Sequence, residues 1–504
     1  MPEEAISRFY TLWGEIEDLE STIELLHWDQ ETVMPEAGNE RRGELLATLT
    51  GVQHRQLTDP ALADTIAAAL EACNDDGDDP RELATAHHLV DRATRVPVEL
   101  AQELASASSA GLSRWRKARA QESFAPFAAA LERNVTLRRE EATALAAGEH
   151  IYDGLLDGYD PGTRTAELVP LFDSLGSALA DAVARAADTG ATIDETKAYG
   201  DFDPDAQLAF GRWSAEEIGF DFSRGRIDPT VHPFCAGSGP TDVRITWRYD
   251  RDDFRPALFG ILHEAGHGMY EQGLPIDRAR KPTGRARSMG VHESQSRLWE
   301  NHVGRHPGFW RHAFPRFQDH FSSWSGTLDE LCPTMHKVQP SLIRVEADEV
   351  TYNLHILVRF RLELDLIEGD LAVADLPTAW DEAYEGMLGV RADKPSMGVL
   401  QDVHWASGLF GYFPTYTLGS LLSAQLFDAA EVELGDLEEA FAAGQFAPLL
   451  EWLRDKIHRH GCYHSATQLT ETATGRPLSA DAFLRYVDAK LERFYGLGSS
   501  NGNG

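Results

Sequence analysis

The stretch that decides the fold is residues 254–270, FRPALFGILHEAGHGMY. Its apolar side chains recur at helical spacing and predict a helix over Pro256–Gly273. These apolar residues are Leu258, Phe259, Ile261 and Leu262. On such a helix His263 and His267 are four residues apart and face the same way, so both imidazoles can reach one zinc ion. Glu264 is offset around the helix, where it can hold a metal-bound water and remove its proton.

A catalytic zinc ion needs a third protein ligand and an open position for water. The segment VHESQS at Val291–Ser296 can supply that ligand, within a second helix predicted over Ser288–His302. The separation of Glu293 from His267 suits a helix, a connecting loop and a second helix packed across the first. The pattern of two histidines and one glutamate favours Glu293, and the rival ligand is His292, which is otherwise a hydrogen-bonding or core histidine.

Glu300 and Asn301 follow on the same predicted helix. They can support the metal ligands through hydrogen bonds, or Glu300 can instead form an ion pair with Arg297 or Arg305. A chain with 19 histidines can also contain the H-E-x-x-H pattern by chance, and surface helices with this pattern exist. The helical context and the third ligand favour a functional site over a chance match.

Helical periodicity also dominates the rest of the chain. Further helices are predicted over residues 3–30, 61–73, 82–94, 97–148, Thr165–Asp188, Leu342–Glu368, Pro377–Leu388 and Leu418–Phe494. Breaks are expected at Pro35–Gly38, Asn74–Pro80 and Gly154–Gly162. The alternating segment VRITWRY at Val243–Tyr249 predicts one small antiparallel sheet near the metal-binding helix. The fold class is therefore mainly α, as a single large helical body over residues 1–495, and the tail 496–504 is expected to be disordered.

The composition excludes several classes of protein. Of the 504 residues 42% are hydrophobic, which is enough for a large core. No apolar run reaches the roughly 18 residues that a membrane helix needs, and the acidic, amphipathic N-terminus lacks the basic start of a signal peptide, so we expect a cytoplasmic protein. The four cysteines are far apart and are expected to be reduced thiols. They are Cys73, Cys235, Cys332 and Cys462.

The charge of the chain is strongly acidic. A formal net charge of −35 should repel nucleic acid and anionic membranes. Such a charge fits either a surface that excludes acidic substrates or adaptation to a salty cytoplasm, where carboxylates keep a protein hydrated. The basic residues are nearly all arginine, and the run DDGDD lies at residues 75–79. These two features favour a halophilic origin.

The segments HEAGH and HESQS together resemble the carboxypeptidase Taq family of zinc metallocarboxypeptidases. Seven further segments resemble motifs of that family, in the same order along the chain. They are Trp28–Pro35 (WDQETVMP), Tyr152–Leu156 (YDGLL), His232–Phe234 (HPF), Asp242–Thr246 (DVRIT), Ile343–Asp348 (IRVEAD), Gly398–Trp405 (GVLQDVHW) and Gly411–Tyr416 (GYFPTY). The resemblance covers about residues 20–495 and includes every predicted zinc position, whereas the acidic surface departs from the family and bears on habitat rather than on chemistry.

The resemblance implies a mostly helical protein with a deep active-site groove lined by the zinc helix. It also implies a helical N-terminal part, about residues 1–190, that covers a catalytic core of about residues 191–495. Members of the family usually form homodimers and remove single residues from the C-termini of peptides, with broad specificity that disfavours proline. Zn²⁺ is the expected cofactor, and Co²⁺ often supports activity.

A carboxypeptidase must recognise a terminal carboxylate, and arginine does this through its planar fork. Arg344, in the family-like segment IRVEAD, is our first candidate for this role. Arg244 is the second candidate, and Asp242 can hold it in place. His232 can bond the substrate backbone or position the active-site loop. A lone arginine is more often solvated or ion-paired, so only the motif context supports the two arginines.

The oxyanion formed during peptide hydrolysis needs hydrogen-bond donors in addition to the metal ion. Tyr412, Tyr416 and His404 are candidates because they lie in family-like segments that are rich in aromatic residues. Asp402 can orient His404. Each of these aromatic side chains is equally compatible with an ordinary place in the core.

Two alternatives remain open from the sequence. The same zinc chemistry serves endopeptidases, aminopeptidases and dipeptidyl carboxypeptidases, and the spacing of the ligands does not exclude them. A helical scaffold or peptide-binding protein with a structural zinc, or with none, is the other alternative. It is disfavoured because structural zinc sites are normally closed by four ligands that are often cysteines, and no cysteine lies near the motif.

Overall fold

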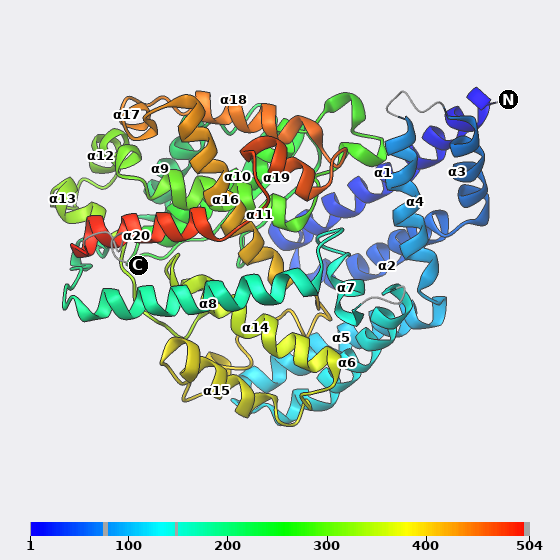
Figure 1. Ribbon diagram of the computed structural model, residues 1–504, viewed down its shortest axis with the longest axis horizontal. Coiled ribbons are helices and arrows are strands. Elements are labelled where there is room, and N and C mark those ends of the chain that lie inside the picture. The colour runs from blue at the N-terminus through cyan, green and yellow to red at the C-terminus, as the bar shows by residue number, and fades with distance from the viewer. Residues whose placement is uncertain (1, 74–78, 147–149, 498–504) are drawn as a thin grey trace. The chain divides into compact units, whose positions relative to one another are not determined.

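The computed structural model describes residues 2–73, 79–146 and 150–497 (Figure 1). The chain divides into two compact units, each made of segments that are far apart in the sequence. Unit 1 comprises Met1–Thr94, Asp194–Met335 and Leu426–Pro477, and unit 2 comprises Arg95–Ile193, His336–Gln425 and Leu478–Gly504. Each unit thus takes residues from the predicted N-terminal cover and from the predicted core. The last seven residues of the predicted disordered tail, 498–504, lie outside the described residues.

Unit 1 is mostly helical. Its helices are α1 (Pro2–Thr32), α2 (Asn39–Leu57), α3 (Pro60–Ala72), α4 (Asp79–Arg95), α9 (Pro204–Ile218), α10 (Arg255–Gly273), α11 (Met289–Arg297), α12 (Pro307–His320), α13 (Leu328–Leu331), α17 (Leu437–Ala442), α18 (Ala447–Lys456) and α19 (Ala466–Thr474). A core of Phe9, Trp13, Ile66 and Leu83 joins α1 with α3 and α4. After Arg297 the helix α11 continues as the π-helical segment Leu298–Gly304.

The sheet of unit 1 has three strands in the order β1-β3-β2, namely β1 (Gly225–Pro229), β2 (Cys235–Gly239) and β3 (Asp242–Trp247). β2 pairs with β3 antiparallel, but β1 pairs with β3 parallel, so the prediction of an antiparallel sheet is wrong for the second pair. The reason is topological, because the short turn after β2 folds β3 back into the space between β2 and β1. α10 packs against β3, as expected from the position of this strand in the sequence.

Unit 2 is built around the buried helix α14 (Thr351–Glu368). Its other helices are α5 (Val98–Ala120), α6 (Ala125–Leu145), α7 (Ile151–Leu156), α8 (Thr165–Asp188), α15 (Leu376–Leu388) and α20 (Asp481–Tyr495). α16 (Phe413–Leu434) begins in unit 2 and ends in unit 1. The core places Phe172 of α8 against Phe360 of α14, with ring centroids 5.1 Å apart.

Several helix boundaries differ from the predicted ones, each for a local reason. The predicted helix over 97–148 is interrupted at residues 121–124, where Glu122 adopts a left-handed φ of 49°. The helix predicted from Leu342 begins only at Thr351, where the carboxylate of Asp348 accepts hydrogen bonds from the backbone N–H groups of Val350 and Thr351 at 2.9 and 3.0 Å. The predicted break at Gly154–Gly162 is partly occupied by α7, and the predicted helical part Leu418–Phe494 consists of the successive helices α16 to α20.

No helix within the described ranges combines the length and the apolar character that crossing a membrane requires.

Candidate metal centre

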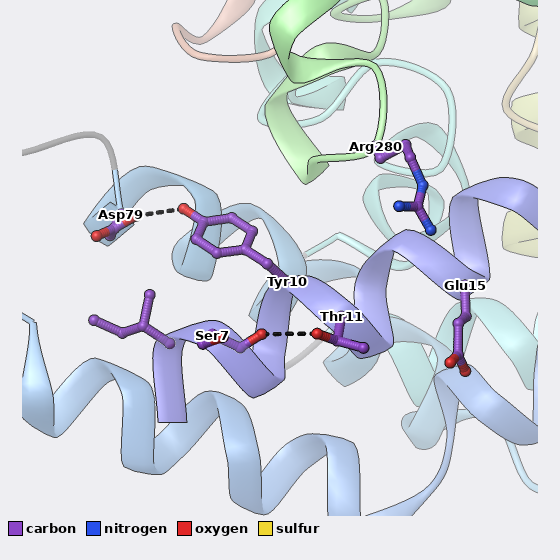
Figure 2. A pocket seen from close by; sticks show the side chains of 7 residues that line it. Ser7, Tyr10, Thr11, Glu15, Asp79 and Arg280 are labelled. Atoms are coloured by element: carbon purple, nitrogen blue, oxygen red, sulfur yellow. Dashed lines mark hydrogen bonds between the residues drawn. The ribbon is translucent and has the colours of Figure 1, made fainter. Parts of the chain in front are cut away.

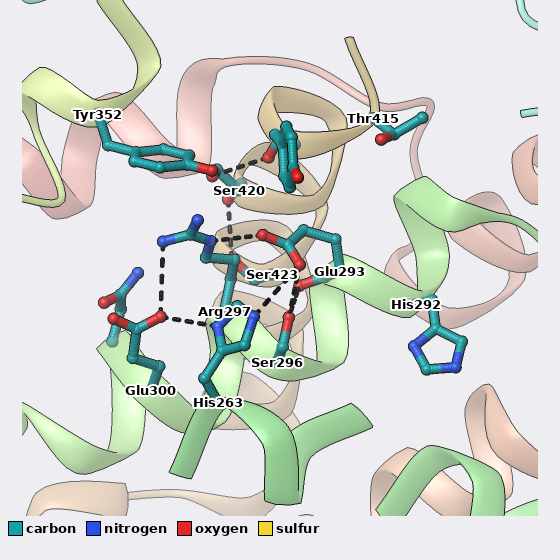
Figure 3. A network of polar contacts seen from close by, with 12 residues as sticks. His263, His292, Glu293, Ser296, Arg297, Glu300, Tyr352, Thr415, Ser420 and Ser423 are labelled. Atoms are coloured by element: carbon teal, nitrogen blue, oxygen red, sulfur yellow. Dashed lines mark hydrogen bonds and ion pairs between the residues drawn. The ribbon is translucent and has the colours of Figure 1, made fainter. Parts of the chain in front are cut away.

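Two neighbouring helices of unit 1 bring together three side chains that could hold a metal ion. α10 carries His263 and His267, and α11 carries Glu293. The Nε2 atoms of the two histidines lie 3.6 Å and 3.4 Å from Oε2 of Glu293. One ligand atom from each residue lies within 4.8 Å of the others, which is close enough for all three to reach one metal ion. Figure 3 shows His263 and Glu293 pointing toward one another.

The close approach of α10 and α11 depends on Gly266. A β-carbon added at this position would lie 2.7 Å from the carbonyl oxygen of Gln295 and 2.7 Å from Cα of Ser296. Atoms do not approach so closely without repulsion, so a larger residue here would push the two helices apart. The glycine in the HEAGH segment therefore allows Glu293 to reach the histidines.

His263 is oriented by Glu300 (Figure 3). Nδ1 of His263 lies 2.9 Å from Oε2 of Glu300, and an ionised carboxylate can only accept a hydrogen bond. The shared proton is therefore carried by Nδ1, and Nε2, which faces Glu293, is the nitrogen that a metal ion can bind when it displaces the second proton. Glu300 also accepts from Arg305 at 3.2 Å and from Arg297 at 3.5 Å. Both roles that the sequence left open for Glu300 are thus present.

His267 is oriented by a second carboxylate, through His292. Nδ1 of His267 lies 2.5 Å from Nδ1 of His292, whose Nε2 lies 2.8 Å from Oε1 of Glu271. Glu271 must accept, so neutral His292 carries its proton on Nε2 and accepts at Nδ1. His267 then donates from Nδ1 and keeps its Nε2 lone pair for a metal ion. His292 points away from His263 in Figure 3, and its geometry is that of a supporting residue.

Glu293 is held by its own helix. Oε1 accepts a hydrogen bond from Nε of Arg297 at 2.7 Å, and Oε2 accepts one from Oγ of Ser296 at 2.9 Å. Burial opposes ionisation, but the charges of Arg297 and His263 outweigh it and hold the pKa of Glu293 well below its usual range. Glu293 is therefore ionised at neutral pH, as a metal ligand must be.

The electrostatics of the centre favour a cation. Burial by itself lowers the pKa of His263, but Glu293 and Glu300 raise it to about 9. Burial lowers the pKa of His267 to about 3. One positive charge is thus stabilised among these groups, while the second histidine stays neutral. A divalent cation fits this environment, because it can replace the proton of His263 between the carboxylates.

Glu264 lies in α10 beside the ligands and is only 6% exposed. Its Oε2 atom is buried and has no hydrogen-bond partner among the described residues. Burial, together with the charges of Glu293 and Glu300, raises the pKa of Glu264 to about 7. A carboxylate oxygen without a partner, next to two imidazole nitrogens and a carboxylate, fits a site that holds a metal ion and its water.

The loop between α10 and α11 is anchored by distant parts of unit 1. Glu82 of α4 is fully buried and accepts hydrogen bonds from the backbone N–H and the hydroxyl of Thr283, at 2.8 Å and 2.7 Å. The backbone N–H of Cys462 donates to the carbonyl oxygen of Thr283 at 3.0 Å. Nε2 of His458 lies 2.9 Å from Oε1 of Gln295 in α11. These contacts fix the spacing between the two ligand-bearing helices.

Two predicted substrate-binding residues lie beside the sheet of unit 1. Both fork nitrogens of Arg244 in β3 bond to Asp242 at 2.9 Å, which is the support that the sequence suggested. The guanidinium also stacks over the ring of Trp28, 4.2 Å from its centroid. His232 is exposed in the segment that connects β1 with β2.

The other four predicted substrate-binding residues come together in unit 2. Arg344 donates to Oδ1 of Asp402 from two nitrogens, at 3.0 Å and 2.8 Å, and lies over the ring of Tyr416. Nε2 of His404 is 3.2 Å from the Tyr416 hydroxyl, and its Nδ1 is 3.8 Å from Asp402. The rings of Tyr412 and Tyr416 lie 5.3 Å apart. Arg344 is buried, and Nε and Nη2 of its guanidinium donate to Asp402 while Nη1 donates to the Tyr352 hydroxyl at 3.2 Å.

Three residues that support these groups were not predicted from the sequence. Glu271 lies one turn after His267 on the same face of α10, a spacing that could have suggested it. Arg359 and Glu363 are fully buried on α14, but this helix also carries exposed charged residues such as Arg361 and Glu368, so its sequence gives no signal that sets the two buried ones apart. Arg359 shares Asp402 with Arg344, and Glu363 accepts hydrogen bonds from Trp405 and Gly411.

A surface pocket of about 670 Å³ lies at the N-terminal end of unit 1 (Figure 2). It is lined by Ile6, Ser7, Tyr10, Thr11, Glu15, Asp79 and Arg280. The hydroxyl of Tyr10 donates to Asp79 across it. None of the predicted site residues lines this pocket, so it is not part of the metal centre.

Comparison with known proteins places the chain in a family. The model of the carboxypeptidase Taq (M32) metallopeptidases matches residues 8–491. Thermostable carboxypeptidase 1 of Thermus thermophilus is 44% identical over 512 residues, which covers 98% of this chain and 100% of the relative. Carboxypeptidase 1 of Bacillus subtilis is 34% identical and covers 97% of this chain and 98% of its own length.

The fold agrees with this relationship. The crystal structure of the M32 carboxypeptidase from Deinococcus radiodurans matches with a TM-score of 0.94 at 37% identity, over 98% of this chain and 100% of that one. The resemblance read from the sequence motifs is thereby confirmed, as is a hydrolase that uses a divalent metal ion. The chain belongs to the carboxypeptidase Taq (M32) family of metallopeptidases.

Proposed function

We propose that the protein is a zinc carboxypeptidase that releases single amino acids from the C-termini of peptides. The observation that carries this proposal is the grouping of His263, His267 and Glu293 beside the unpartnered carboxylate of Glu264. Two imidazoles and one carboxylate are the donor set of many catalytic zinc sites, which keep one position open for water. Cobalt, with similar ligand preferences, should substitute.

In this proposal His263, His267 and Glu293 would hold the zinc ion, which would supply an acidified water and a positive charge beside the scissile carbonyl. Glu264 accepts the proton of that water as general base and then donates it to the leaving amine. Glu300 and the pair His292–Glu271 keep the two histidines in the tautomer that presents Nε2. Arg297 and Ser296 keep Glu293 ionised and correctly oriented.

Recognition of the substrate is proposed for the residues that the family motifs single out. Arg344 remains the first candidate for the terminal carboxylate, because it lies in the family-like segment IRVEAD and over the ring of Tyr416, which is also close to His404. Arg244 has its own carboxylate in Asp242 and is the second candidate. His404, Tyr412 and Tyr416 are proposed donors to the oxyanion, and exposed His232 is proposed to contact the peptide backbone. We also propose broad specificity with proline disfavoured, and a homodimer.

The test is the hydrolysis of one short peptide that is offered with either a free or an amidated C-terminus. The enzyme is assayed in high salt as purified, after chelation, and after zinc or cobalt is returned, and the products are separated by mass. Release of the last residue from the free peptide alone, restored by metal, supports the proposal. Release of dipeptides would instead indicate a dipeptidyl carboxypeptidase, and equal cleavage of both peptides an endopeptidase or aminopeptidase.

A further inference from the structure

Asp402 of unit 2 is shared by two arginines. Its Oδ1 accepts from Arg344 at 3.0 Å and 2.8 Å, and its Oδ2 accepts from Nε of Arg359 at 2.6 Å. Arg344 is buried, and the side chain of Arg359 has no exposed surface. Two guanidinium groups and one carboxylate thus form a charged cluster inside unit 2, and burying such a cluster is costly unless its charges balance.

The charges of this cluster do not balance. Burial, with the charges of the two arginines, lowers the pKa of His355 to about 2 and the pKa of His404 to about 3, so both histidines are neutral. The charged groups acting on each of them are Arg344, Arg359 and Asp402. The cluster therefore carries one excess positive charge.

The donors of the cluster are also not all satisfied. A guanidinium has five N–H donors. Nε of Arg359 is used by Asp402, and its first terminal nitrogen is used by the carbonyl oxygen of His355 at 2.7 Å and the hydroxyl of Tyr384 at 3.0 Å. The second terminal nitrogen is buried and has no acceptor among the described residues, and neither has the indole N–H of Trp380. The Arg359 guanidinium lies 4.7 Å from the centre of the Trp380 ring.

An excess positive charge together with unused N–H donors is the chemistry of an anion site. A buried water could accept hydrogen bonds from these donors, but it would leave the charge uncompensated. Because Arg359, Trp380 and Tyr384 are enclosed, with at most 1% of each exposed, an occupant must be small. We propose that the cluster holds one inorganic monovalent anion of halide size, bound at the unpaired nitrogen of Arg359.

The test uses the full-length protein without peptide substrate, so its outcome is independent of the proposed peptidase activity. The melting temperature is measured in sodium chloride, sodium bromide and sodium gluconate at equal sodium concentration, and crystals are soaked in bromide. The variant Arg359→Gln removes the charge and the unpaired donor. Arg361→Gln is the matched control, because Arg361 lies on the same helix but is half-exposed and pairs with Asp173.

We expect a melting temperature that rises with the logarithm of the halide concentration, relative to gluconate, in the wild type and in Arg361→Gln. In Arg359→Gln the melting temperature should be the same in halide and in gluconate. In wild-type crystals, bromide should give a peak beside Arg359 in the anomalous difference map. Equal melting temperatures in all three salts without a bromide peak would overturn the proposal and leave water as the occupant. If Arg359→Gln does not fold, the salt series and the bromide peak of the wild type decide the question.

The terminal carboxylate of a peptide substrate is the other anion that could bind to this cluster. An N-acetylated amino acid with a free carboxylate, added in gluconate, separates the two sources. Stabilisation by this compound, in the absence of any halide effect, would assign the charge to substrate binding and would contradict an inorganic ion.

Discussion

The Nδ1 atom of His267 lies 2.5 Å from the Nδ1 atom of His292, so two imidazole rings on adjacent helices share one proton. Which ring carries that proton decides whether His267 can bind a metal ion through Nε2. Glu271, 2.8 Å from the far nitrogen of His292, fixes the answer because it can only accept. A residue that does not touch the metal position thereby selects the ligand tautomer.

Replacing Glu271 with leucine should weaken zinc binding by about 10- to 100-fold, the usual effect of removing the partner of a ligand histidine. Glu271→Gln should retain most of the affinity, since its amide oxygen can still accept from His292. Zinc affinity is measured by competition with a chromogenic chelator. Glu216→Leu, at an exposed position on α9, is the control. Equal zinc affinities of Glu271→Leu and the wild type would show that Glu271 does not control the tautomer of His267.

Replacing Gly266 with alanine should also weaken zinc binding, by about tenfold or more, because the new methyl group displaces α11 from α10 and with it Glu293. Gly260→Ala is a matched control on the same helix, where an added β-carbon meets nothing within 4 Å. The control should bind zinc like the wild type and gain slightly in stability from its higher helix propensity. The same chelator competition measures the zinc affinity of both variants. Similar affinities would show that zinc binding does not depend on the close approach of α10 and α11.

Replacing Glu264 with glutamine should reduce kcat by about 10²- to 10⁴-fold, since the variant has no general base. Zinc affinity should change little, because Glu264 is not one of the three grouped ligands. Peptide hydrolysis and metal content are measured on the same preparation. A variant that binds zinc but retains full activity would assign the proton transfer to another group.

Buried Glu363 should make the stability of the protein depend on pH. Burial raises its pKa from 4.5 to about 7, although Gly411, Tyr152 and Trp405 donate hydrogen bonds to it. The folded protein therefore keeps this proton up to about pH 7, whereas the unfolded chain loses it near 4.5. The contribution of Glu363 to the free energy of unfolding is therefore fully present below pH 4.5. It falls by about 3 kcal/mol as the pH rises to 7.

Glu363→Gln is neutral at every pH and should lack this part of the decline. The measurement is the free energy of unfolding in urea at pH 5 and pH 7.5 for the wild type and the variant. Glu167→Gln, an exposed substitution on α8, corrects for general charge effects. If wild type and Glu363→Gln lose the same stability between the two pH values, Glu363 is already ionised in the folded protein.

Local patterns predicted many of the helices and the grouping of the three candidate metal ligands. α8 spans Thr165–Asp188 as predicted, because its apolar residues keep a helical period without interruption. The spacing of His263, His267 and Glu293 was informative because the first two share a helix and the third follows on the next one. These relationships depend on residues close together in the sequence.

Features that depend on distant contacts could not be predicted. β1 and β2 were missed because Pro229 and the glycine-rich segment Cys235–Gly239 are poor strand signals. The turn at Glu122 contains neither glycine nor proline to mark it. The role of Glu271 requires knowing that His292 turns its Nε2 toward Glu271, and the sharing of Asp402 by two arginines requires the tertiary fold.

The anchoring of the α10–α11 loop by Cys462 and of Gln295 by His458 has a consequence for synthesis on the ribosome. His458 leaves the ribosome roughly 165 residues after Glu293, which corresponds to about 8 to 33 seconds at bacterial elongation rates of about 5–20 residues per second. During that interval His263, His267 and Glu293 have already been synthesised, whereas the contacts of His458 and Cys462 that fix the spacing of their helices cannot yet form. Tight metal capture should therefore begin only near the end of translation, which gives the growing chain little opportunity to trap the wrong ion.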